Sequence, residues 1–404
     1  MSRFDYTASQ RELKEQAAEL ADSRLAALAG RWDTNEEFPE ETYAMLREHG
    51  FLGLTVPLEY GGRGLGVEES CIALEEISRG CLATAMALQM NVNGPPKALA
   101  TLGTEDQKER FLPGAVDGSR FFAIAMTEPQ AGSDGMNLQS SLSRDGEAWL
   151  LTGTKCFITG GARADTYLVF CRAPDSAGSR GIGAVIVERG QPGFAEPEVE
   201  RKMGGRGIAE ATLRFRNVRI EPENVLISPD PDSKRGAEIL LTQFNPERCG
   251  NAAMSIGIAR AAFNASVEWT ATREQFGRPL IEFQGLQWMI SDMAVDIEAA
   301  RLLLRNAAST RDERGFPRTR ETAMAKLFAN EMCRRVADSA VQLHGHRGYS
   351  AEHSVERYFR DARGLSIGGG TTEILRNMIA SEVTGRRFNQ RAYAPRQTGS
   401  SQMV

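Results

Sequence analysis

The sequence predicts a mostly helical α+β protein with three domains in the order helical, β, helical. Helix-forming stretches with short turns fill residues 1–118, and short runs of β-branched and aromatic residues follow over residues 119–232. Long helical stripes return over residues 233–388, and a polar tail occupies residues 389–404. A chain of 404 residues can bury a core in each unit, and a cleft where the three meet is the natural ligand site.

The first zone is expected to consist of helices joined by tight turns. The segment RELKEQAAELADSRLAAL carries a helical apolar stripe, and FPEETYAMLREHG ends with Gly50 after His49, which is a typical helix stop. The glycines of EYGGRGLGVEES match a dinucleotide-binding fingerprint only loosely, because no strand precedes them. We therefore expect a turn there and a new helix that begins near Val67.

The second zone has the pattern of a β domain. TYLVFCRA, GIGAVIVE and ATLRFRNVRI are short β-branched or aromatic runs, and clusters of Gly, Pro and Asp separate them. This spacing is typical of a small barrel or sandwich, and we expect a β-barrel domain.

The third zone is expected to form an antiparallel four-helix bundle. A 4-3-4-3-4 spacing of apolar residues defines a buried seam, formed by Leu286, Ile290, Met293, Ile297, Ala300 and Leu304. Further helices are expected around residues 254–269, over 321–343 and over 371–384.

Composition and charge exclude several classes of protein. The net charge of −5 gives no basic field for nucleic acid, and no apolar run approaches the roughly 20 residues that span a membrane. The start, MSRFDYTASQRELKEQ, lacks the apolar core of a signal peptide, and its acidic residues argue against a transit peptide. Six scattered cysteines without a CxxC pair indicate unpaired thiols in a reducing compartment, most simply the cytoplasm. The HGH at 344–346 has no further ligand at metal spacing, so no metal is expected.

Two segments around the β domain have groups suited to a flat polar ligand. In AMTEPQAGSD, Thr127, Gly132 and Ser133 offer hydroxyl and amide groups to a ring edge or a phosphate, although a generic turn explains the segment equally well. In KCFITGGARAD, Phe157 and Thr159 share one face of a strand, which suits a heterocycle that packs on one residue and bonds the other. An alternating barrel strand is an equally good interpretation.

Three glycine-containing segments of the third zone could also approach a ligand. TREQFGRPLIEFQ contains Arg273, whose guanidinium can fork onto phosphate oxygens, and QLHGHRGY ends a helix with glycines. A surface turn would explain either segment. GLSIGGGTTEILRN places Gly368, Gly369 and Gly370 directly before a helix start, as expected where something approaches the backbone closely or φ is positive.

In this order and spacing, these segments resemble the acyl-CoA dehydrogenase family from about residue 5 to 388. The fold of that family, with a helical domain, a β-barrel and a four-helix bundle, matches the three zones. The resemblance implies one FAD per subunit in the cleft, completed by a neighbouring subunit of a homotetramer. It also implies an acyl-CoA substrate in fatty acid or amino acid catabolism and an electron-transfer flavoprotein as electron acceptor.

The resemblance assigns cofactor contacts to particular positions. The flavin would be lined by Met126, Thr127, Ser133, Phe157 and Thr159. The other FAD contacts, partly across the subunit interface, would come from Arg273, Gln275, Phe276, Gln284, Gln342, Gly345, His346, Thr371 and Glu373. Among these, His346 stands where the family often has glycine, which makes that contact a departure from the pattern.

The catalytic base of the family is displaced in this chain. Many members carry a catalytic Glu in the pattern Tyr-Glu-Gly-Thr before the last helix, where this chain has GGGT with Gly369 at the Glu position. A minority, resembling isovaleryl-CoA and long-chain acyl-CoA dehydrogenases, instead carries a Glu directly before an Arg at the start of the first long bundle helix. Glu247 directly precedes Arg248 here, so the resemblance implies that Glu247 is the base. Alternatively, Glu247 is an acid at a helix N-terminus, with Pro246 at the first position.

The chemistry explains why such a site needs glycines and a shielded carboxylate. Removing the α-proton of a thioester requires a desolvated base and hydrogen-bond donors for the enolate oxygen, and the resemblance assigns one donor to the N–H of Gly369. It places Ser133, Asn245, Arg248 and Gly368 beside the substrate. Gly368 leaves width near the β and γ carbons, which favours a branched or bulky acyl group.

Two other functions fit the same residues. Related proteins oxidise acyl or aminoacyl groups on carrier proteins, and Asn245, where many relatives have Asp near the CoA moiety, weakens the CoA assumption. A flavin-binding subunit without turnover is the alternative from another class, and the presence of Glu247 argues against it.

Overall fold

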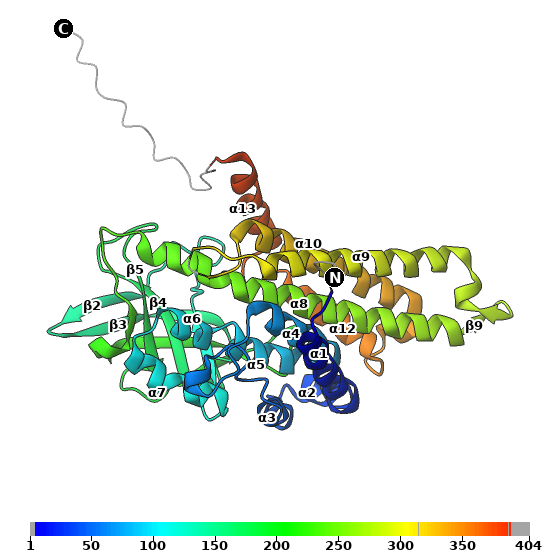
Figure 1. Cartoon of the computed structure of the whole chain (residues 1–404), viewed down its shortest axis with the longest axis horizontal. Helices are drawn as coiled ribbons and strands as arrows, with labels where there is room; N and C mark the ends of the chain where they lie inside the picture. Colours follow the sequence, from blue (N-terminus) through cyan, green and yellow to red (C-terminus); the bar gives the residue numbers. More distant parts are fainter. Residues whose placement is uncertain (1–4, 314, 387, 389–404) are drawn as a thin grey trace, which may run out of the picture.

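The computed structural model describes residues 5–313, 315–386 and 388, so the tail expected over 389–404 lies outside the described residues. The order helical, β, helical is confirmed (Figure 1). The helices of the first zone are α1 (Ala8–Leu20), α2 (Ala26–Asn35), α3 (Glu40–Glu48), α4 (Val67–Gly80), α5 (Leu82–Val92), α6 (Pro95–Leu102) and α7 (Glu105–Val116). A π-helical turn, Ala21–Leu25, joins α1 to α2.

Local signals set several of these boundaries. The helix expected near Val67 begins there, and the carboxylate of Glu69 accepts from the N–H of Gly66. The stop expected at Gly50 is also present, because Gly50 has φ 70° directly after α3 and its cap.

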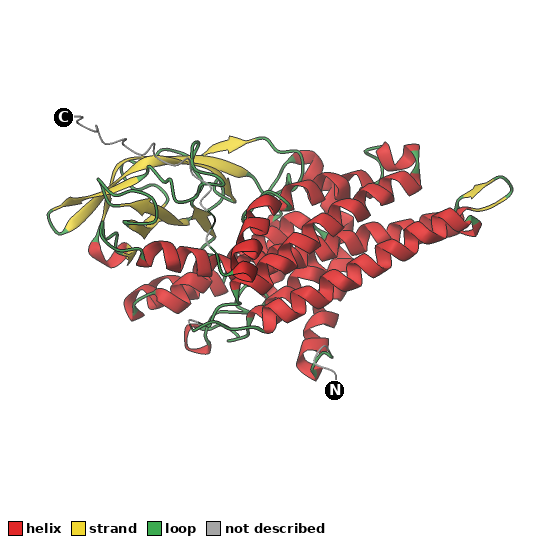
Figure 2. Ribbon diagram, turned by 90° about the horizontal axis from the view of Figure 1, so that it is seen from above, coloured by secondary structure: helices red, strands yellow, loops and turns green. Residues whose placement is uncertain are grey.

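The middle zone is a β domain whose strands form one hydrogen-bonded path. Its strands are β1 (Phe122–Ala125), β2 (Ser141–Asp145), β3 (Ala148–Thr159), β4 (Thr166–Arg172), β5 (Ile182–Glu188), β6 (Glu198–Glu200), β7 (Glu210–Ile220) and β8 (Val225–Ile227). The order is β6-β7-β3-β2-β4-β5-β8, with β1 parallel to β4. Over these residues β6 and β8 are the ends of the path, so the expected barrel is not a closed ring of hydrogen-bonded strands. Figure 2 shows the strands of this middle domain at one end of the molecule and the helical bundle at the other.

The third zone is helical, and its first helix begins before the stretch expected around residues 254–269. Its elements are α8 (Arg235–Thr272), α9 (Gln284–Ser309), α10 (Thr319–His344), α11 (His346–Tyr349), α12 (Ser354–Leu365) and α13 (Thr372–Thr384). The hairpin β9 (Glu274–Gln275) and β10 (Arg278–Pro279) joins α8 to α9. Helix α8 runs through Pro246, so the alternative that placed Glu247 at a helix N-terminus is wrong. A proline inside a helix costs about 3 kcal/mol, and the burial of α8 against α4, α10 and the β domain outweighs this cost.

The bundle is also arranged differently from the expectation. The seam of α9 is present, with Met293, Ile297, Ala300 and Leu304 buried. Helix α12, which was not predicted, packs against α8 and α10, whereas α13 contacts α10 and stands away from the body of the molecule (Figure 1). The helix expected over 371–384 therefore exists, but α12 takes its place in the bundle.

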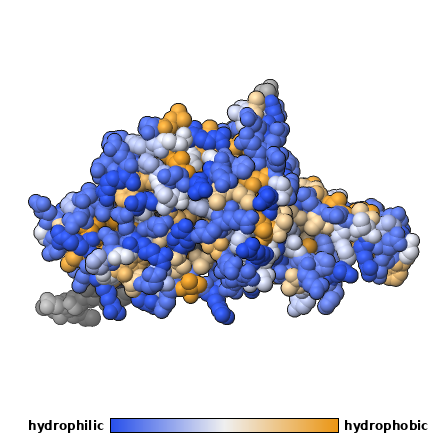
Figure 3. All heavy atoms as spheres, turned by 90° about the horizontal axis from the view of Figure 1, so that it is seen from below, coloured by the Kyte–Doolittle hydropathy of each residue, from blue (hydrophilic) through white to orange (hydrophobic). Residues whose placement is uncertain are grey.

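One face of the molecule carries mostly polar residues (Figure 3). Hydrophilic residues dominate the face shown in Figure 3, with separate apolar patches between them. Within the described part of the chain, no helix is long and apolar enough to cross a membrane.

Candidate active site

The glycine segment between α12 and α13 has a backbone that requires glycine. Gly369 has φ 69° and Gly370 has φ 100°, values that residues with side chains rarely adopt. The N–H groups of Gly369, Gly370 and Thr371 make no hydrogen bond to any described part of the chain. The segment thus offers three consecutive donors to a ligand. Thr371 caps α13, because its hydroxyl accepts from the N–H of Ile374 at 3.3 Å, and Glu373 is exposed in the first turn.

Arg248 links the glycine segment to α8. Its Nε donates to the carbonyl of Gly369 at 3.2 Å, and its Nη1 donates to the side-chain oxygen of Asn245 at 2.9 Å. Asn245 is fully buried, and its amide nitrogen donates to the carbonyl of Pro317 and the hydroxyl of Thr319. The direct substrate contact expected of Asn245 is therefore not supported, since its amide is occupied within the protein and instead orients Arg248.

Glu247 lies beside Arg248, twelve residues into α8. Its Oε2 atom is buried and has no hydrogen-bond partner, while the residue as a whole keeps some accessible surface. Gln89 on α5 donates to the Glu247 carbonyl at 2.9 Å, so α5 borders this position. Loss of hydration raises the pKa of Glu247 to about 7, although the nearby charges of Arg248 and Lys326 oppose the rise. The Glu247 carboxylate is thus shielded from water at Oε2, the residue is partly accessible, and its pKa lies close to neutral pH.

The loop after β1 is fixed by a buried ion pair. Lys155 is completely buried, and its ammonium contacts Glu128 at 2.7 Å and the carbonyl of Met126 at 3.0 Å. The Glu128 carboxylate also accepts from the N–H groups of residues 139 and 140, so it holds both ends of the loop. Thr127 follows Met126 and is partly accessible, and Ser133 is exposed at the loop tip. The loop can therefore present these residues to a ligand without losing its shape.

A bulge in β3 turns Phe157 outward. The pairing of β3 with β7 shifts register between Lys155 and Ile158, and Phe157 has φ 56° and is 60% exposed. Thr159 is on the same, partly accessible side of the strand, whereas Ile158 between them is buried. An exposed aromatic ring beside a hydroxyl forms a surface that a flat ring system can cover.

The remaining expected cofactor residues lie at the far end of the bundle. Arg273, Gln275 and Phe276 are in or beside the β9–β10 hairpin, and the Phe276 side chain is 94% exposed. The other members of this distal group are Gln284 at the start of α9 and Gln342, Gly345 and His346 at the end of α10. Thr272, where α8 ends, is 25 residues from Glu247, which along a helix is roughly 38 Å. One chain therefore does not bring the distal group to Glu247.

His344, the first histidine of the HGH motif, has a structural role. His344 stacks on Trp269 with ring centroids 5.3 Å apart, and its Nδ1 lies 2.7 Å from the carbonyl of Ala340. Among the described residues, no group of three or more His, Cys, Asp or Glu side chains is arranged to hold a metal ion.

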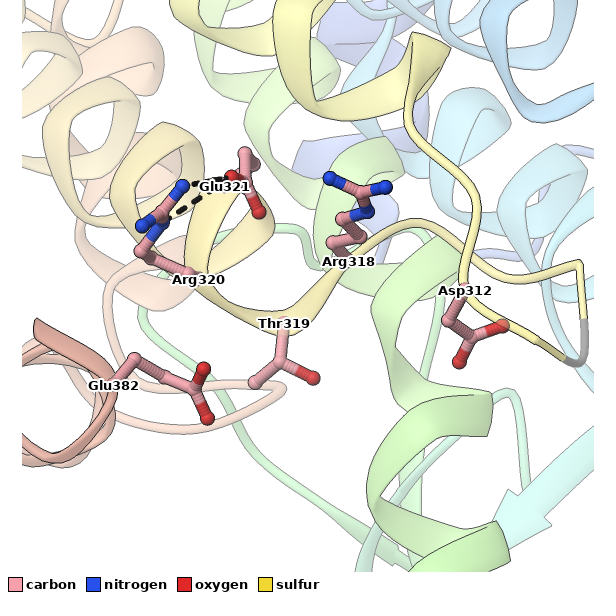
Figure 4. Close-up of a pocket in the computed structure, with 6 residues that line it drawn as sticks. All are labelled: Asp312, Arg318, Thr319, Arg320, Glu321 and Glu382. Carbon is pink, nitrogen blue, oxygen red and sulfur yellow. Dashed lines mark hydrogen bonds and ion pairs between the residues drawn. The ribbon is translucent and has the colours of Figure 1, made fainter. Parts of the chain in front are cut away.

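A surface hollow of about 280 Å³ lies beside the start of α10 (Figure 4). It is lined by Asp312, Arg318, Thr319, Arg320, Glu321 and Glu382. Two arginines and three acids leave it with a net charge of −1, and Arg320 is paired with Glu321. The hollow suits neither the apolar face of a flavin nor the phosphates of a nucleotide.

Sequence reasoning missed two polar residues of this site. Gln243 is one turn before Glu247 on α8, and its buried Oε1 has no partner. Lys326 on α10 is fully buried against the glycine segment. A signal was present for Gln243, since apart from Glu247 its neighbours three and four residues away, Ile239, Leu240 and Pro246, are apolar; Lys326, with Thr322 and Asn330 four residues away, carried no such signal.

The amino-acid sequence matches family models along nearly its whole length. The models are Acyl-CoA dehydrogenase, N-terminal domain over residues 7–119, middle domain over 123–218 and C-terminal domain over 234–384.

Named relatives agree with the family models. The chain is 38% identical over 391 residues to the 3-sulfinopropanoyl-CoA desulfinase of Advenella mimigardefordensis, which covers 96% of both proteins. It is 39% identical over 390 residues to the acryloyl-CoA reductase (NADH) of Anaerotignum propionicum, with 96% of this chain and 98% of that protein covered. The structure of butyryl-CoA dehydrogenase from Megasphaera elsdenii superposes with a TM-score of 0.89 at 34% identity, over 94% of this chain and 99% of that one. The chain therefore belongs to the acyl-CoA dehydrogenase family.

Proposed function

We propose that this chain removes a proton and a hydride from an acyl thioester, with Glu247 as the base that takes the Cα proton. The observation that carries the proposal is the buried Oε2 atom of Glu247, which has no hydrogen-bond partner in the described chain. The next residue in the chain, Arg248, holds the carbonyl of Gly369. Membership of the family makes the protein an FAD-dependent oxidoreductase of the acyl-CoA dehydrogenase type.

The residues present fit FAD. The firmly held loop that follows Met126 offers the hydroxyls of Thr127 and Ser133, and the outward-facing Phe157 and Thr159 add an exposed aromatic ring and a further hydroxyl. FAD, when bound, supplies an acceptor for the hydride that leaves Cβ.

The protein groups then have separate tasks in the proposed reaction. The Glu247 carboxylate takes the Cα proton onto an oxygen that water does not hydrate, and a pKa of about 7 leaves enough of it ionised near neutral pH. The unpaired N–H groups of the glycine segment, Gly369 among them, donate to the thioester carbonyl as negative charge develops on its oxygen. Arg248 keeps the Gly369 carbonyl turned toward α8.

We also propose that the active protein contains several copies of this chain. The distal group, with Arg273, Gln275 and Phe276 exposed, would reach the FAD of a neighbouring subunit, as in a homotetramer. An exposed apolar stripe along α9 supports this arrangement: Trp288 is 62%, Val295 69% and Leu302 39% exposed, at seven-residue spacing. Such a stripe on a long helix is typical of a protein–protein interface.

The acyl group is proposed to be uncharged and branched or bulky. Helix α5, which borders Glu247 through Gln89, has no charged residue from Leu82 to Val92. It therefore offers no cation to an anionic group such as a sulfinate. Gly368 leaves room, because a Cβ there would meet only the carbonyl oxygen of Gly364, at 4.0 Å. The isovaleryl-CoA-like subgroup remains part of this proposal.

Two further points concern partners. An electron-transfer flavoprotein is the proposed electron acceptor, and the reducing state implied by six unpaired cysteines favours the cytoplasm. A carrier-protein thioester is the second candidate substrate, because the amide of Asn245 is turned inward onto Thr319 and the hollow that Thr319 lines is not cationic.

The experiment that tests the proposed function is an anaerobic titration of the FAD-loaded protein with isovaleryl-, isobutyryl-, butyryl-, octanoyl- and palmitoyl-CoA. Rapid bleaching of the flavin by one of them is the expected result and identifies the acyl class. Bleaching only by a carrier-bound thioester would support the second candidate. No bleaching by any thioester, with FAD bound, would contradict the dehydrogenation and point to a subunit without turnover.

A further inference from the structure

Lys326 is a fully buried lysine whose ammonium binds backbone carbonyls. Its Nζ lies 2.9 Å from the side-chain oxygen of Asn330, 3.0 Å from the Gly370 carbonyl and 3.3 Å from the Leu365 carbonyl. Within the described residues it forms no ion pair inside 4.0 Å. A buried lysine usually needs a carboxylate partner, so one devoted to loop carbonyls calls for an explanation.

Lys326 belongs to a set of buried polar groups that hold one segment. Arg248 donates to the Gly369 carbonyl at 3.2 Å, and the amide of Asn251 donates to the Leu365 carbonyl at 3.2 Å. Asn330, which accepts from Lys326, donates to Asn251 and so connects α10 to α8. Side chains from two helices thereby fix both ends of the segment between α12 and α13.

The direction of these bonds determines where the N–H groups of the segment point. In a trans peptide the C=O and the N–H point to opposite sides. Because the carbonyls of Gly369 and Gly370 point toward Arg248 and Lys326, the N–H groups of Gly370 and Thr371 point away from α8 and α10. These N–H groups have no acceptor within the described chain.

We propose that Lys326 is a positioning residue for the proton abstraction assigned to Glu247. By holding the carbonyls of Leu365 and Gly370, it anchors both ends of the glycine segment and fixes the peptide plane that carries the Thr371 N–H, so that the unpaired N–H groups stay directed at the thioester carbonyl. This inference rests on the function proposed above. The Cε of Lys326 is 3.5 Å from where a Cβ on Gly369 would lie, so the stem also supports the segment from beneath.

The charge of Lys326 gives it a second effect on the base. The charged groups that influence Glu247 are Arg248 on α8 and Lys326 on α10, and both lower the pKa of Glu247, while α5 has no charged residue. Burial and the nearby Arg248 lower the pKa of Lys326 itself to about 7, and Glu247 opposes this. Removal of the lysine charge therefore raises the pKa of Glu247 further above its ordinary range.

The test compares Lys326→Met, which keeps the stem and removes charge and donors, with the wild type, both loaded with FAD. Lys14→Met on the surface of α1 is the control, and it is expected to behave as wild type. The rate of flavin reduction at saturating thioester should fall by about 10- to 100-fold in Lys326→Met, with little change in thioester affinity. The acid limb of its pH–rate profile should move to higher pH. Bound 4-dimethylaminocinnamoyl-CoA should show a smaller red shift than in wild type, because its carbonyl is less polarised.

Two outcomes separate this inference from the proposed function. If no thioester bleaches the flavin of the wild-type protein, the proposed function is contradicted. If a thioester bleaches the wild type, and Lys326→Met has the same rate, pH profile and red shift, only the role of Lys326 is overturned. Should Lys326→Met fail to hold FAD, Lys326→Gln keeps a donor for the carbonyls without the charge. In Lys326→Gln the acid limb should still move to higher pH, and an unmoved limb overturns the effect of the charge.

Discussion

The pH dependence of substrate-driven flavin reduction follows directly from the environment of Glu247. The perturbation is a change of pH from 8 to 5, with one thioester at low concentration. Burial raises the pKa of Glu247 to about 7 from an ordinary value of 4.5, with Arg248 and Lys326 opposing the rise. Since only the ionised carboxylate can accept the Cα proton, the reaction should lose rate as Glu247 becomes protonated.

The magnitude can be worked from this pKa. The carboxylate is about half ionised at pH 7, about 10% ionised at pH 6 and about 1% ionised at pH 5. A solvent-exposed glutamate would still be about 75% ionised at pH 5. The two situations therefore differ by nearly two orders of magnitude in rate at pH 5.

The assay is stopped-flow reduction of the flavin under anaerobic conditions, at thioester concentrations well below saturation. The second-order rate constant should rise with pH with a midpoint near 7. FAD retention at each pH serves as the control, because loss of cofactor would imitate loss of rate. A rate constant that stays level down to pH 5.5 would refute the reasoning that Glu247 is a desolvated base.

Other perturbations test separate parts of the structure. Gly368→Phe should leave the fold intact, because a Cβ there has open space, and should slow reduction by isovaleryl-CoA more than by butyryl-CoA; equal losses for both would remove the argument for a branched acyl group. Trp288→Glu on the exposed stripe of α9 should lower the particle mass in light scattering and release FAD. An unchanged mass would show that the stripe does not hold the subunits together. Lys155→Met leaves the carboxylate of Glu128 buried without its cation, at a cost of about 3–5 kcal/mol, so both Tm and the FAD content should fall; full FAD content would show that the pair does not hold the flavin loop. The folded state raises the pKa of Glu247, so protonation of Glu247 stabilises the fold below pH 4.5, and this contribution is lost as pH rises through about 7. Glu247→Gln should therefore increase the free energy of unfolding at pH 8 by up to about 3 kcal/mol, seen as a higher Tm, and should change it little at pH 4.5. A larger gain at pH 4.5 than at pH 8 would contradict the pKa.

The sequence predicted those parts of the fold that depend on local signals. The start of α4 at Val67, the start of α13 directly after Gly370 and the seam of α9 each follow from signals within a few residues. The expectation that Glu247 and Gly369 belong to one site came from the family resemblance. The hydrogen bond from Arg248 to the Gly369 carbonyl brings the glycine segment next to the residue that follows Glu247.

The parts that were not predicted depend on distant contacts. Pro246 is a local signal for a helix start, and only the packing of α8 on several partners overrides it. Helix α12 is rich in charges, and its Arg360 is paired with Asp33 on α2, a partner more than 300 residues away in the sequence. A helical lysine such as Lys326 looks like a solvated residue until the segment around Gly370 is placed against it.

The most direct test of Glu247 as the base is single-turnover reduction of the flavin in Glu247→Gln, with the thioester that bleaches the wild type. Glutamine keeps the size of the side chain and cannot take the proton, so FAD and thioester should still bind, and bleaching should be slower by at least about a thousandfold. Bleaching at the wild-type rate in Glu247→Gln would contradict the assignment of the base.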